Sequence, residues 1–437
     1  MRWLKETVRP YYLRWIYFPL RPQRHPQAFQ DCWQYPFDKL SDSVRLPEST
    51  SNLPDLLFYP MTDWHERIQR TQHLARALAA LGFRSIYINP HLGREFETTP
   101  LWDKAHRLAQ LEKNIFELHI RLPREPVFHD RLLSGGEEEI VAEAIGRVLP
   151  KWDRPPGLSG QAGRPVPTRA IQILSFPLWL GVARRFRDEA AFPMVYDCHD
   201  LLSGFQNIDS GLIRAETDLL EAADLVLFSS QGLMDRYRSV KRGMLVRNAA
   251  SATLFQTAAV SRPVEPLVAG YVGALESWFD VEAIERSAAL HPQCRFILAG
   301  RIEFDPIQRL RALPNVEFTG EIPHTRVPEL LARFRIALIP FRINPLTLMT
   351  NPIKLYEYFS CGLPVVSTPL PEAQAMGGLV YVGASPADFA RQVGQALAED
   401  DPRQRARRRE IALRESWTAR ARDISAEFGA LTKCTEV

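Results

Sequence analysis

The chain has 437 residues, more than one domain usually holds, so we expect two domains. A hydrophobic fraction of 46% and a charged fraction of 24% are typical of a soluble globular protein, and a net charge of +3 is too small to favour nucleic acid as a partner. No apolar run reaches the ~18 residues that cross a membrane. The scattered cysteines and the absence of an apolar core at the start predict a cytoplasmic protein without a secretory signal.

The N-terminal arm, residues 1–50, mixes aromatic side chains with arginines and has weak periodicity. Aromatic rings and cations suit the interface of an anionic membrane. One interpretation is therefore peripheral contact with the inner face of the cell membrane. The other is an arm that packs on the protein's own surface.

Residues 51–250 alternate short apolar strands with amphipathic helices and form the first predicted domain. Strands are expected at 55–61, 85–90, 115–120, 170–177, 194–200 and 224–230, and helices at 64–81, 137–149 and 210–223. A turn-rich loop interrupts this order at 154–167. Such alternation predicts a parallel sheet with helices on both faces.

The alternation stops in a linker, residues 251–266, and resumes over 267–400. Strands are expected at 267–274, 295–300, 315–320, 336–341, 365–367 and 379–383, and helices at 281–290, 306–313, 326–334, 352–361 and 386–398. A tail, 401–437, contains an arginine-rich helix expected to lie in solvent. The predicted fold is α/β, with two Rossmann-like doubly wound domains that face each other across a cleft. Ligands of such sheets bind outside the carboxyl ends of the strands.

The most informative stretch is Asn351–Pro371, NPIKLYEYFSCGLPVVSTPLP. Pro352 suits a first helical position and Gly362 a helix end. Lys354 and Glu357 lie one turn apart on the predicted helix. A lysine in the first turn adds charge to a helix N-terminus that already attracts phosphate, while the glutamate can accept hydrogen bonds from sugar hydroxyls. The alternative is a surface helix with a charge pair.

Other strand ends of the second domain add weaker signals. Gly273, Gly300-Arg301 and Gly320-Glu321 each follow a predicted strand, and Arg342 with Asn344 precedes the helix. Together with Asn351, Lys354 and Glu357 they predict a nucleotide pocket in which Lys354 and Arg301 bind phosphate. Neither a dinucleotide fingerprint nor a Walker A pattern occurs, which argues against a nicotinamide enzyme and a P-loop ATPase.

In the first domain, Asp197, His199 and Asp200 cluster at the end of an apolar strand. These are side chains for proton transfer near neutral pH, and we treat all three as catalytic candidates. The alternative is a capping aspartate beside a hydrogen-bonded histidine. No DxD pair occurs, so metal dependence is not expected, and we predict no cofactor.

A third group, Asp63, Trp64 and Arg70, stands at a predicted helix start on the acceptor side of the cleft. Trp64 could stack on a sugar face and Arg70 could meet an anionic acceptor. The alternative is that Asp63 caps the helix and Trp64 packs against it.

These motifs resemble the GT-B glycosyltransferases of the bacterial group 1 type. KLYEYFSCGLPVVSTPLPE is the most specific part, and the resemblance implies that Glu357 binds the ribose and Lys354 the diphosphate. VYDCHDLLSGF, DLVLFSS and GYVGALESWFD are most similar to teichuronic-acid and exopolysaccharide glycosyltransferases. In inverting relatives the strand-end aspartate is the acid/base residue, which points to Asp200, with His199 near the sugar.

The sequence also departs from that family. Met349 stands where many retaining members carry a glutamate, and Ala274 and Trp278 stand where they carry Arg and Lys. Whether the reaction inverts or retains configuration therefore stays open.

We expect transfer of a sugar from a nucleoside-diphosphate sugar, such as a UDP- or GDP-sugar, to a hydroxyl acceptor on a glycan or lipid. The alternatives are a nucleotide-sugar 2-epimerase of the same architecture and a non-catalytic sugar-binding subunit.

Overall fold

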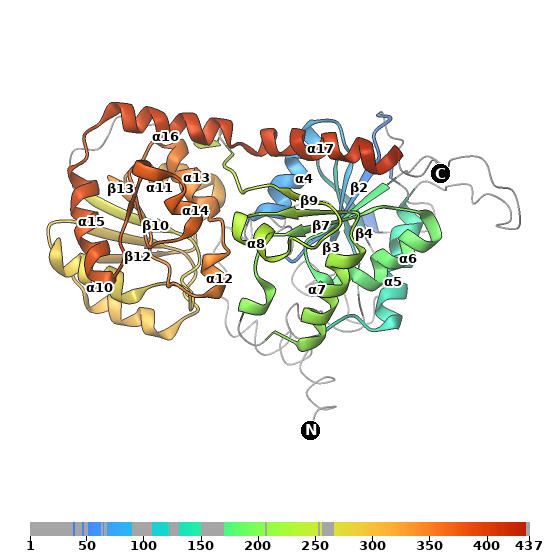
Figure 1. Ribbon diagram of the computed structural model, residues 1–437, viewed down its shortest axis with the longest axis horizontal. Helices are drawn as coiled ribbons and strands as arrows, with labels where there is room; N and C mark the ends of the chain where they lie inside the picture. Colours follow the sequence, from blue (N-terminus) through green and yellow to red (C-terminus); the bar gives the residue numbers. More distant parts are fainter. Residues whose placement is uncertain are drawn as a thin grey trace, which may run out of the picture.

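The computed structural model describes residues 38–39, 46–47, 51–62, 64, 68–89, 107–120, 122, 131–149, 170–205, 208–251, 254–255 and 266–433. These residues form two lobes, each built around one sheet (Figure 1). Most of the predicted N-terminal arm, the turn-rich loop 154–167, most of the linker and Asp63 lie outside the described residues.

The first sheet has nine strands in the order β1-β4-β5-β3-β2-β6-β7-β8-β9. They are β1 (Asp38–Lys39), β2 (Asp55–Tyr59), β3 (Ser85–Asn89), β4 (Arg107–Glu112), β5 (Ile115–His119), β6 (Ala170–Leu174), β7 (Met194–Cys198), β8 (Leu225–Phe228) and β9 (Gly243–Leu245). All neighbours are parallel except where β4 meets β1 and β5. Alternate residues of β2 enter different hydrophobic clusters, so both faces of this sheet are covered.

Helices and 3-10 turns cover these two faces. They are α4 (Arg70–Ala80), α5 (Gly135–Val148), η3 (Pro177–Trp179), α6 (Leu180–Ala190), η4 (Leu202–Gly204), α7 (Ser210–Ala222) and α8 (Gln231–Arg236). Ser134, Asp209 and Ser230 cap α5, α7 and α8 by accepting backbone N–H groups, which explains where those helices begin. The helix expected from residue 64 begins only at Arg70, and α6 and strands β4 and β9 were not predicted.

The second sheet is wholly parallel, in the order β12-β11-β10-β13-β14-β15. Its strands are β10 (Val268–Val272), β11 (Arg295–Ala299), β12 (Val316–Gly320), β13 (Ile336–Ile339), β14 (Val365–Ser367) and β15 (Val380–Val382). The chain order reverses between β10 and β13, which therefore form the topological switch point of this lobe.

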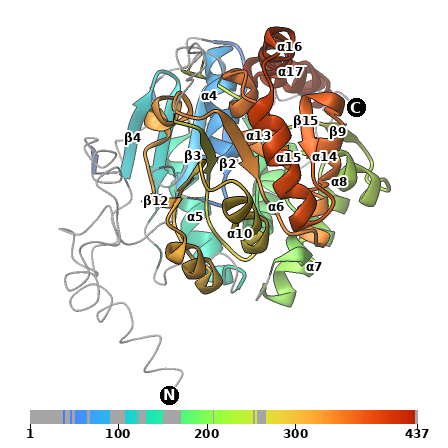
Figure 2. The same cartoon turned by 90° about the vertical axis from the view of Figure 1, so that its left-hand side faces the viewer.

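Helices again lie on both faces of the second sheet, and α10 packs along α15 (Figure 2). They are α10 (Val281–Leu290), η5 (Asp305–Ala312), η6 (His324–Arg326), α11 (Val327–Leu331), α12 (Pro345–Leu348), α13 (Ile353–Ser360), α14 (Pro371–Gln374), η7 (Gly377–Leu379) and α15 (Pro386–Ala398). The helix expected at 306–313 is a 3-10 helix, and Pro352 is the N-cap of α13 rather than its first residue.

The tail was expected to be one solvated helix, but it forms two that run along both lobes (Figure 1). Helix α16 (Pro402–Arg414) packs on α13, and α17 (Trp417–Lys433) packs on α4 of the first lobe. Trp417, Ile424 and Phe428 of α17 are buried in the first lobe's core. The tail therefore ties the two lobes together.

Arg408 shows most clearly that the tail is not simply solvated. Its side chain is 0% exposed and makes two hydrogen bonds of 2.7 and 2.6 Å to the Glu399 carboxylate. A third bond of 2.9 Å goes to the Leu379 carbonyl. A buried guanidinium keeps its charge only when such partners surround it, so this pair fixes α16 to the second lobe.

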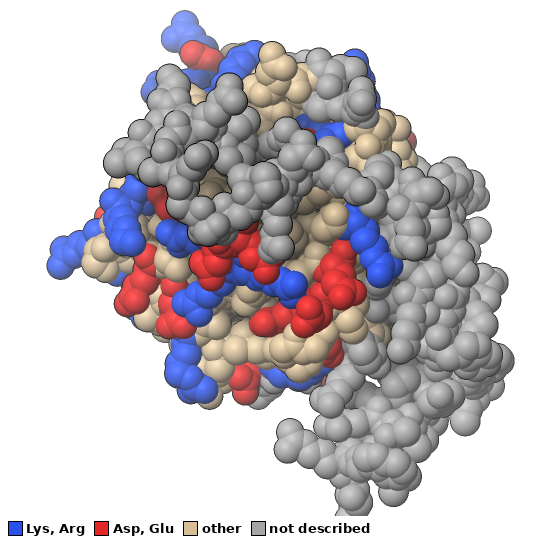
Figure 3. Space-filling model, turned by 90° about the vertical axis from the view of Figure 1, so that its right-hand side faces the viewer, with Lys and Arg blue, Asp and Glu red and all other residues tan. Residues whose placement is uncertain are grey.

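The surface at the first-lobe end carries acidic and basic side chains interspersed among its described residues (Figure 3). Within the described part of the chain, no helix combines the length and apolarity needed to cross a bilayer.

Candidate active site

Three glycines with positive φ lie at the carboxyl ends of neighbouring strands β10, β11 and β12. They are Gly273 (φ 145°), Gly300 (φ 152°) and Gly320 (φ 73°). A Cβ on Gly300 would lie 1.8 Å from the Gly273 carbonyl oxygen, so only glycine permits the ends of β10 and β11 to approach this closely. The result is an edge of bare backbone, the glycine edge, formed by three adjacent strand ends that carry no side chains.

Lys354, the second residue of α13, lies over this edge. A Cβ on Gly273 would be 3.1 Å from its Cε and 3.3 Å from its Nζ. The Nζ lies 5.3 Å from the centre of the Tyr271 ring and 4.8 Å from that of Phe341, so two aromatic faces support the ammonium group. Lys354 thus places a cation where α13 begins, beside the end of β10.

Glu357, one turn further along α13, faces His324 of η6. Its Oε1 lies 2.9 Å from His324 Nε2, and the two side chains are 10% and 20% exposed. The His324 ring also meets His73 of the first lobe, with ring centres 5.4 Å apart. Sequence reasoning missed His324, although its place just after the predicted Gly320-Glu321 strand end was a usable signal.

Arg301 and Glu321 lie at the ends of β11 and β12, as expected. Arg301 is 40% exposed and its Nε lies 2.6 Å from Glu303, a partner that compensates its charge. Glu321 is half-buried directly after Gly320. Both residues therefore border the glycine edge.

In the first lobe, His199 and Asp200 follow β7. His199 Nδ1 lies 3.0 Å from the Asp197 carbonyl oxygen, while its Nε2 lies 3.9 Å from Asp200 Oδ2. Their side chains are 12% and 29% exposed. Desolvation raises the pKa of Asp200, opposed by the nearby charges of His199 and Arg70 and assisted by Asp197. A carboxylate with a raised pKa that borders solvent is suited to act as a base.

Asp197 and Arg70 are placed differently from the expectation that they contact substrate. Arg70 Nε donates to Asp197 Oδ1 at 2.8 Å, and their side chains are 3% and 0% exposed. Helices cover both faces of the sheet, so the Asp197 side chain, which projects from one face of β7, does not reach the cleft. The two residues form an internal ion pair behind Asp200.

Trp64 also lies inside the first lobe, 4% exposed. Its ring packs edge-on against Tyr87 at 5.1 Å, and the Arg76 guanidinium lies 4.6 Å from its centre. Trp64 as placed has no face to offer a sugar. This corrects the expected stacking role and agrees with the packing alternative.

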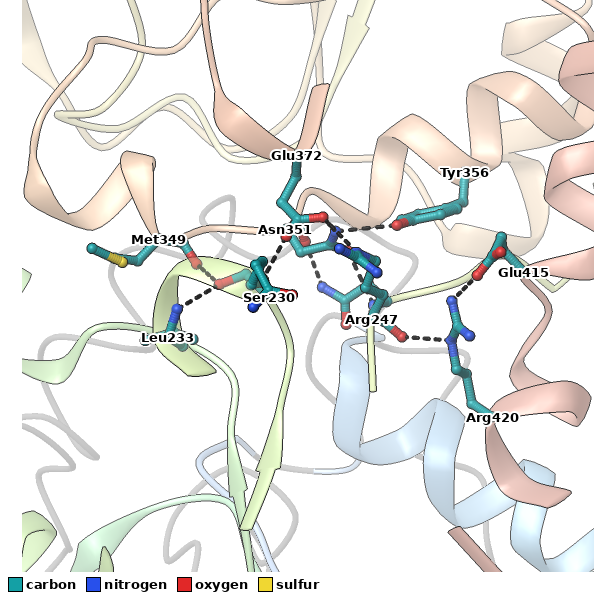
Figure 4. Close-up of polar contacts among 11 residues, drawn as sticks. Ser230, Leu233, Arg247, Met349, Asn351, Tyr356, Glu372, Glu415 and Arg420 are labelled. Carbon is teal, nitrogen blue, oxygen red and sulfur yellow. Dashed lines mark hydrogen bonds and ion pairs between the residues drawn. The ribbon is translucent and has the colours of Figure 1, made fainter. Parts of the chain in front are cut away.

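Asn351 is 1% exposed, and its polar atoms are engaged inside the protein rather than at a ligand surface (Figure 4). Its Nδ2 donates to Glu372 at 3.0 Å and to the Tyr356 hydroxyl at 3.1 Å, and its Oδ1 accepts from the Asn248 N–H at 3.0 Å. Asn351 therefore joins the second lobe to the chain leaving β9, which corrects its expected contact with the nucleotide.

Met349, just before it, also faces the first lobe. The Met349 carbonyl accepts from Ser230 Oγ at 2.5 Å (Figure 4). Its Sδ would lie 2.7 Å from a Cβ on Gly232, the second residue of α8. The position where a retaining relative often has a carboxylate is thus packed against the opposite lobe.

A pocket of about 380 Å³ lies between the lobes, at the switch point of the second sheet. Its lining comes from the loops after β7, β10 and β13: Gly204, Phe205, Ser277, Trp278, Arg342, Ile343, Asn344 and Leu346. The Arg342 N–H donates to the Trp278 carbonyl at 2.7 Å and so ties two of these loops together. Sequence reasoning placed Arg342 and Asn344 near the cleft but missed the aromatic pair Phe205 and Trp278. Among the residues that the structure describes, no three His, Cys, Asp or Glu side chains gather as a metal site requires.

Comparison with solved structures defines the class of the fold. Sucrose-phosphate synthase from Thermosynechococcus elongatus superposes with a TM-score of 0.64 at 17% identity, over 87% of this chain and 99% of that one. HepE from Anabaena, in complex with UDP and glucose, gives a TM-score of 0.59 at 16% identity, over 86% of this chain and 100% of that one. The chain has the GT-B fold, as predicted.

Sequence comparison identifies the second lobe more narrowly. Residues 266–399 match the family described as "Glycosyl transferases group 1". A Bacillus subtilis (strain 168) protein named "Putative teichuronic acid biosynthesis glycosyltransferase TuaH" is 29% identical over 259 residues, which are 53% of this chain and 65% of that protein. The match thus spans less than two thirds of that relative. The second lobe thus matches the group 1 glycosyltransferase family model, which confirms the predicted resemblance.

Proposed function

We propose that the protein transfers a sugar from a nucleoside-diphosphate sugar to a hydroxyl group of a glycan or lipid-linked acceptor, without a metal. The observation that carries this proposal is the position of Lys354 at the start of α13, over the glycine edge and beside the switch-point strand β10. A cation, bare backbone and a helix N-terminus together suit a diphosphate. The UDP bound to HepE supports a UDP-sugar as donor, and TuaH supports polysaccharide synthesis.

The chain's own groups suffice for a simple scheme. As the bond from the sugar C1 to the diphosphate oxygen breaks, Lys354 Nζ and the N–H groups at the start of α13 stabilise the charge on the leaving diphosphate. Asp200 takes the proton of the acceptor hydroxyl if attack comes from the opposite face of the sugar. Glu357, oriented by His324, accepts hydrogen bonds from the ribose hydroxyls. Arg301, Glu321 and Gly273 border the nucleotide.

The acceptor is proposed to enter the pocket between the lobes. Trp278 and Phe205 offer apolar faces for a sugar ring, and Arg342 offers a cation. The scattered cysteines support a location in the reducing cytoplasm, and the aromatic and basic residues of 1–50 support contact with the inner face of the cell membrane.

A thermal-shift screen with UDP, GDP, ADP, dTDP and their sugars tests the proposal. A ligand at about 100 times its Kd should stabilise the binding lobe by about 2.7 kcal/mol. If none of them shifts the unfolding temperature, the proposal fails. Conversion of the nucleotide sugar without any acceptor would identify an epimerase instead.

A further inference from the structure

A continuous chain of buried polar contacts crosses between the lobes. It begins at Asp197, which pairs with Arg70; Arg70 Nη1 then donates to Asn248 Oδ1 at 3.0 Å. Asn248 Nδ2 donates to the Asn351 carbonyl at 2.5 Å, and the Asn248 N–H donates to Asn351 Oδ1 at 3.0 Å. Asn351 in turn binds Glu372 at 3.0 Å. Each of these residues is less than 10% exposed.

The two ends of this chain lie beside the two halves of the candidate active site. Asp197 is three residues before Asp200, and its carbonyl contacts the His199 ring. Asn351 is three residues before Lys354, at the entry to α13. Asn248 lies between them, 7% exposed, on the segment that leaves the first lobe. Its side chain bonds to Arg70 of the first lobe and to Asn351 of the second. Glu372 also joins the lobes, because its carboxylate accepts from the Gln231 N–H and from Arg247 Nε.

The arrangement is not one that stability alone favours. A buried ion pair is often no more stable than apolar packing of the same volume. Arg70 Nη2 and Asp197 Oδ2 are both buried and have no hydrogen-bond partner among the described residues. Unpaired buried polar atoms cost free energy, so the pair calls for another explanation.

We propose that Asn248 is a positioning residue: through Arg70 and Asn351 it fixes the loop that carries Asp200 relative to the start of α13. Binding of a nucleoside diphosphate at Lys354 then orders the Asp200 loop in the opposite lobe. This inference rests on the proposed function, because it needs a nucleotide at α13.

Hydrogen exchange on the full chain tests the coupling. The probe is whichever of UDP, GDP, ADP and dTDP most raises the unfolding temperature of the wild-type protein. In the wild type, a saturating probe should slow exchange both at 350–360 and at 196–204 and 68–74. In Asn248→Ala the protection at 350–360 should remain and that in the first lobe should be lost. Affinity for the probe should change less than about threefold, because Asn248 contacts no part of the phosphate site.

Ser230→Ala is the matched control. Ser230 also makes a short hydrogen bond between the lobes, to the Met349 carbonyl, but it is not in the chain from Asp197 to Glu372. The Ser230→Ala variant should keep the slowed hydrogen exchange of the first lobe. If Ser230→Ala loses that protection as well, the effect is general loosening of the interface and the proposal is wrong. Protection that persists in Asn248→Ala also overturns it.

Two further readouts separate positioning from folding. With a nucleotide sugar that the wild type uses as donor, Asn248→Ala should lower kcat at least tenfold and leave the donor KM within about twofold. A folding defect would instead lower the fraction of active protein, and the molecules that fold would keep the first-lobe protection. If Asn248→Ala does not fold, Asn248→Ser, too short to reach both partners, replaces it with the same expected outcomes. If the wild type binds none of the four nucleotides, the proposed function is wrong, and so is the proposed coupling that rests on it.

Discussion

The Lys354 side chain covers Gly273, so the end of β10 and the start of α13 share one cation. A single methyl group on Gly273 would press on Lys354 at 3.1 Å and would need a positive φ that other residues rarely adopt. The cation and the bare backbone are therefore parts of one geometry.

Lys354→Ala should weaken binding of the nucleoside diphosphate by about 10- to 100-fold, because a hydrogen bond to a charged group contributes about 1.5–3 kcal/mol. Isothermal titration of UDP measures this. Lys113→Ala, which removes an exposed lysine of the turn between β4 and β5, should leave the affinity unchanged. Equal affinity in wild type and Lys354→Ala would exclude Lys354 from the phosphate site.

Asp200→Asn should lower sugar transfer by about 10²- to 10⁴-fold if Asp200 is the base, while UDP binds as before. Because desolvation raises the pKa of Asp200, the wild-type rate should fall on the acidic side at a pH above the ordinary range of an aspartate. That acidic limb should disappear in Asp200→Asn. Near-normal turnover of the variant would show that no first-lobe carboxylate is needed, as in a retaining reaction.

His73 should make the protein less stable in mild acid. It stacks on Trp417 at 4.9 Å, and burial, assisted by the charges of His324 and Arg76, holds the pKa of His73 well below its usual range. Below about pH 6.5 the unfolded chain binds a proton that the folded chain refuses, so each pH unit costs about 1.4 kcal/mol.

The variant His73→Phe keeps a ring on Trp417 and removes this titration. Urea unfolding at pH 7.5 and 5.0 should therefore show a smaller loss of stability in the variant, by about 2 kcal/mol. Identical pH dependence in the two proteins would mean that His73 is protonated in the folded state.

Arg408→Ala should destabilise the second lobe by about 3–5 kcal/mol, because it leaves the Glu399 carboxylate buried without its partner. The neighbouring Arg407 is exposed, and Arg407→Ala should stay within about 0.5 kcal/mol of the wild type. Thermal unfolding of the two variants compares them directly. A small effect at Arg408 would mean that water or another cation reaches Glu399.

Much of the fold could be predicted because strand and helix periods differ. Helix α10 has the predicted bounds, and β10, β11 and β12 lie where apolar runs end in glycine. Strand β4 was missed because it lies in an antiparallel hairpin outside the βα alternation. Helix α6 was missed because Arg184, Arg185 and Arg187 hide its narrow apolar stripe.

The candidate site was only partly predictable. Period-2 alternation groups Asp197 of β7 with His199 just after the strand, but it does not show which face reaches solvent, since helices cover both. The helix after β2 begins six residues later than expected, so Trp64 faces the core. Arg408 looked solvated because its partner, Glu399, precedes the tail helix. Such contacts depend on tertiary packing, which no local pattern contains.

The route of α17 has a consequence for biosynthesis. Trp417, Ile424 and Phe428 complete the first lobe's core, yet the ribosome makes them after the whole second lobe. The apolar face of the first lobe that α17 covers therefore stays exposed until the second lobe and the tail have been synthesised. We expect the nascent chain to need a chaperone during that interval, and a first lobe expressed alone to aggregate unless α17 is supplied as a separate peptide.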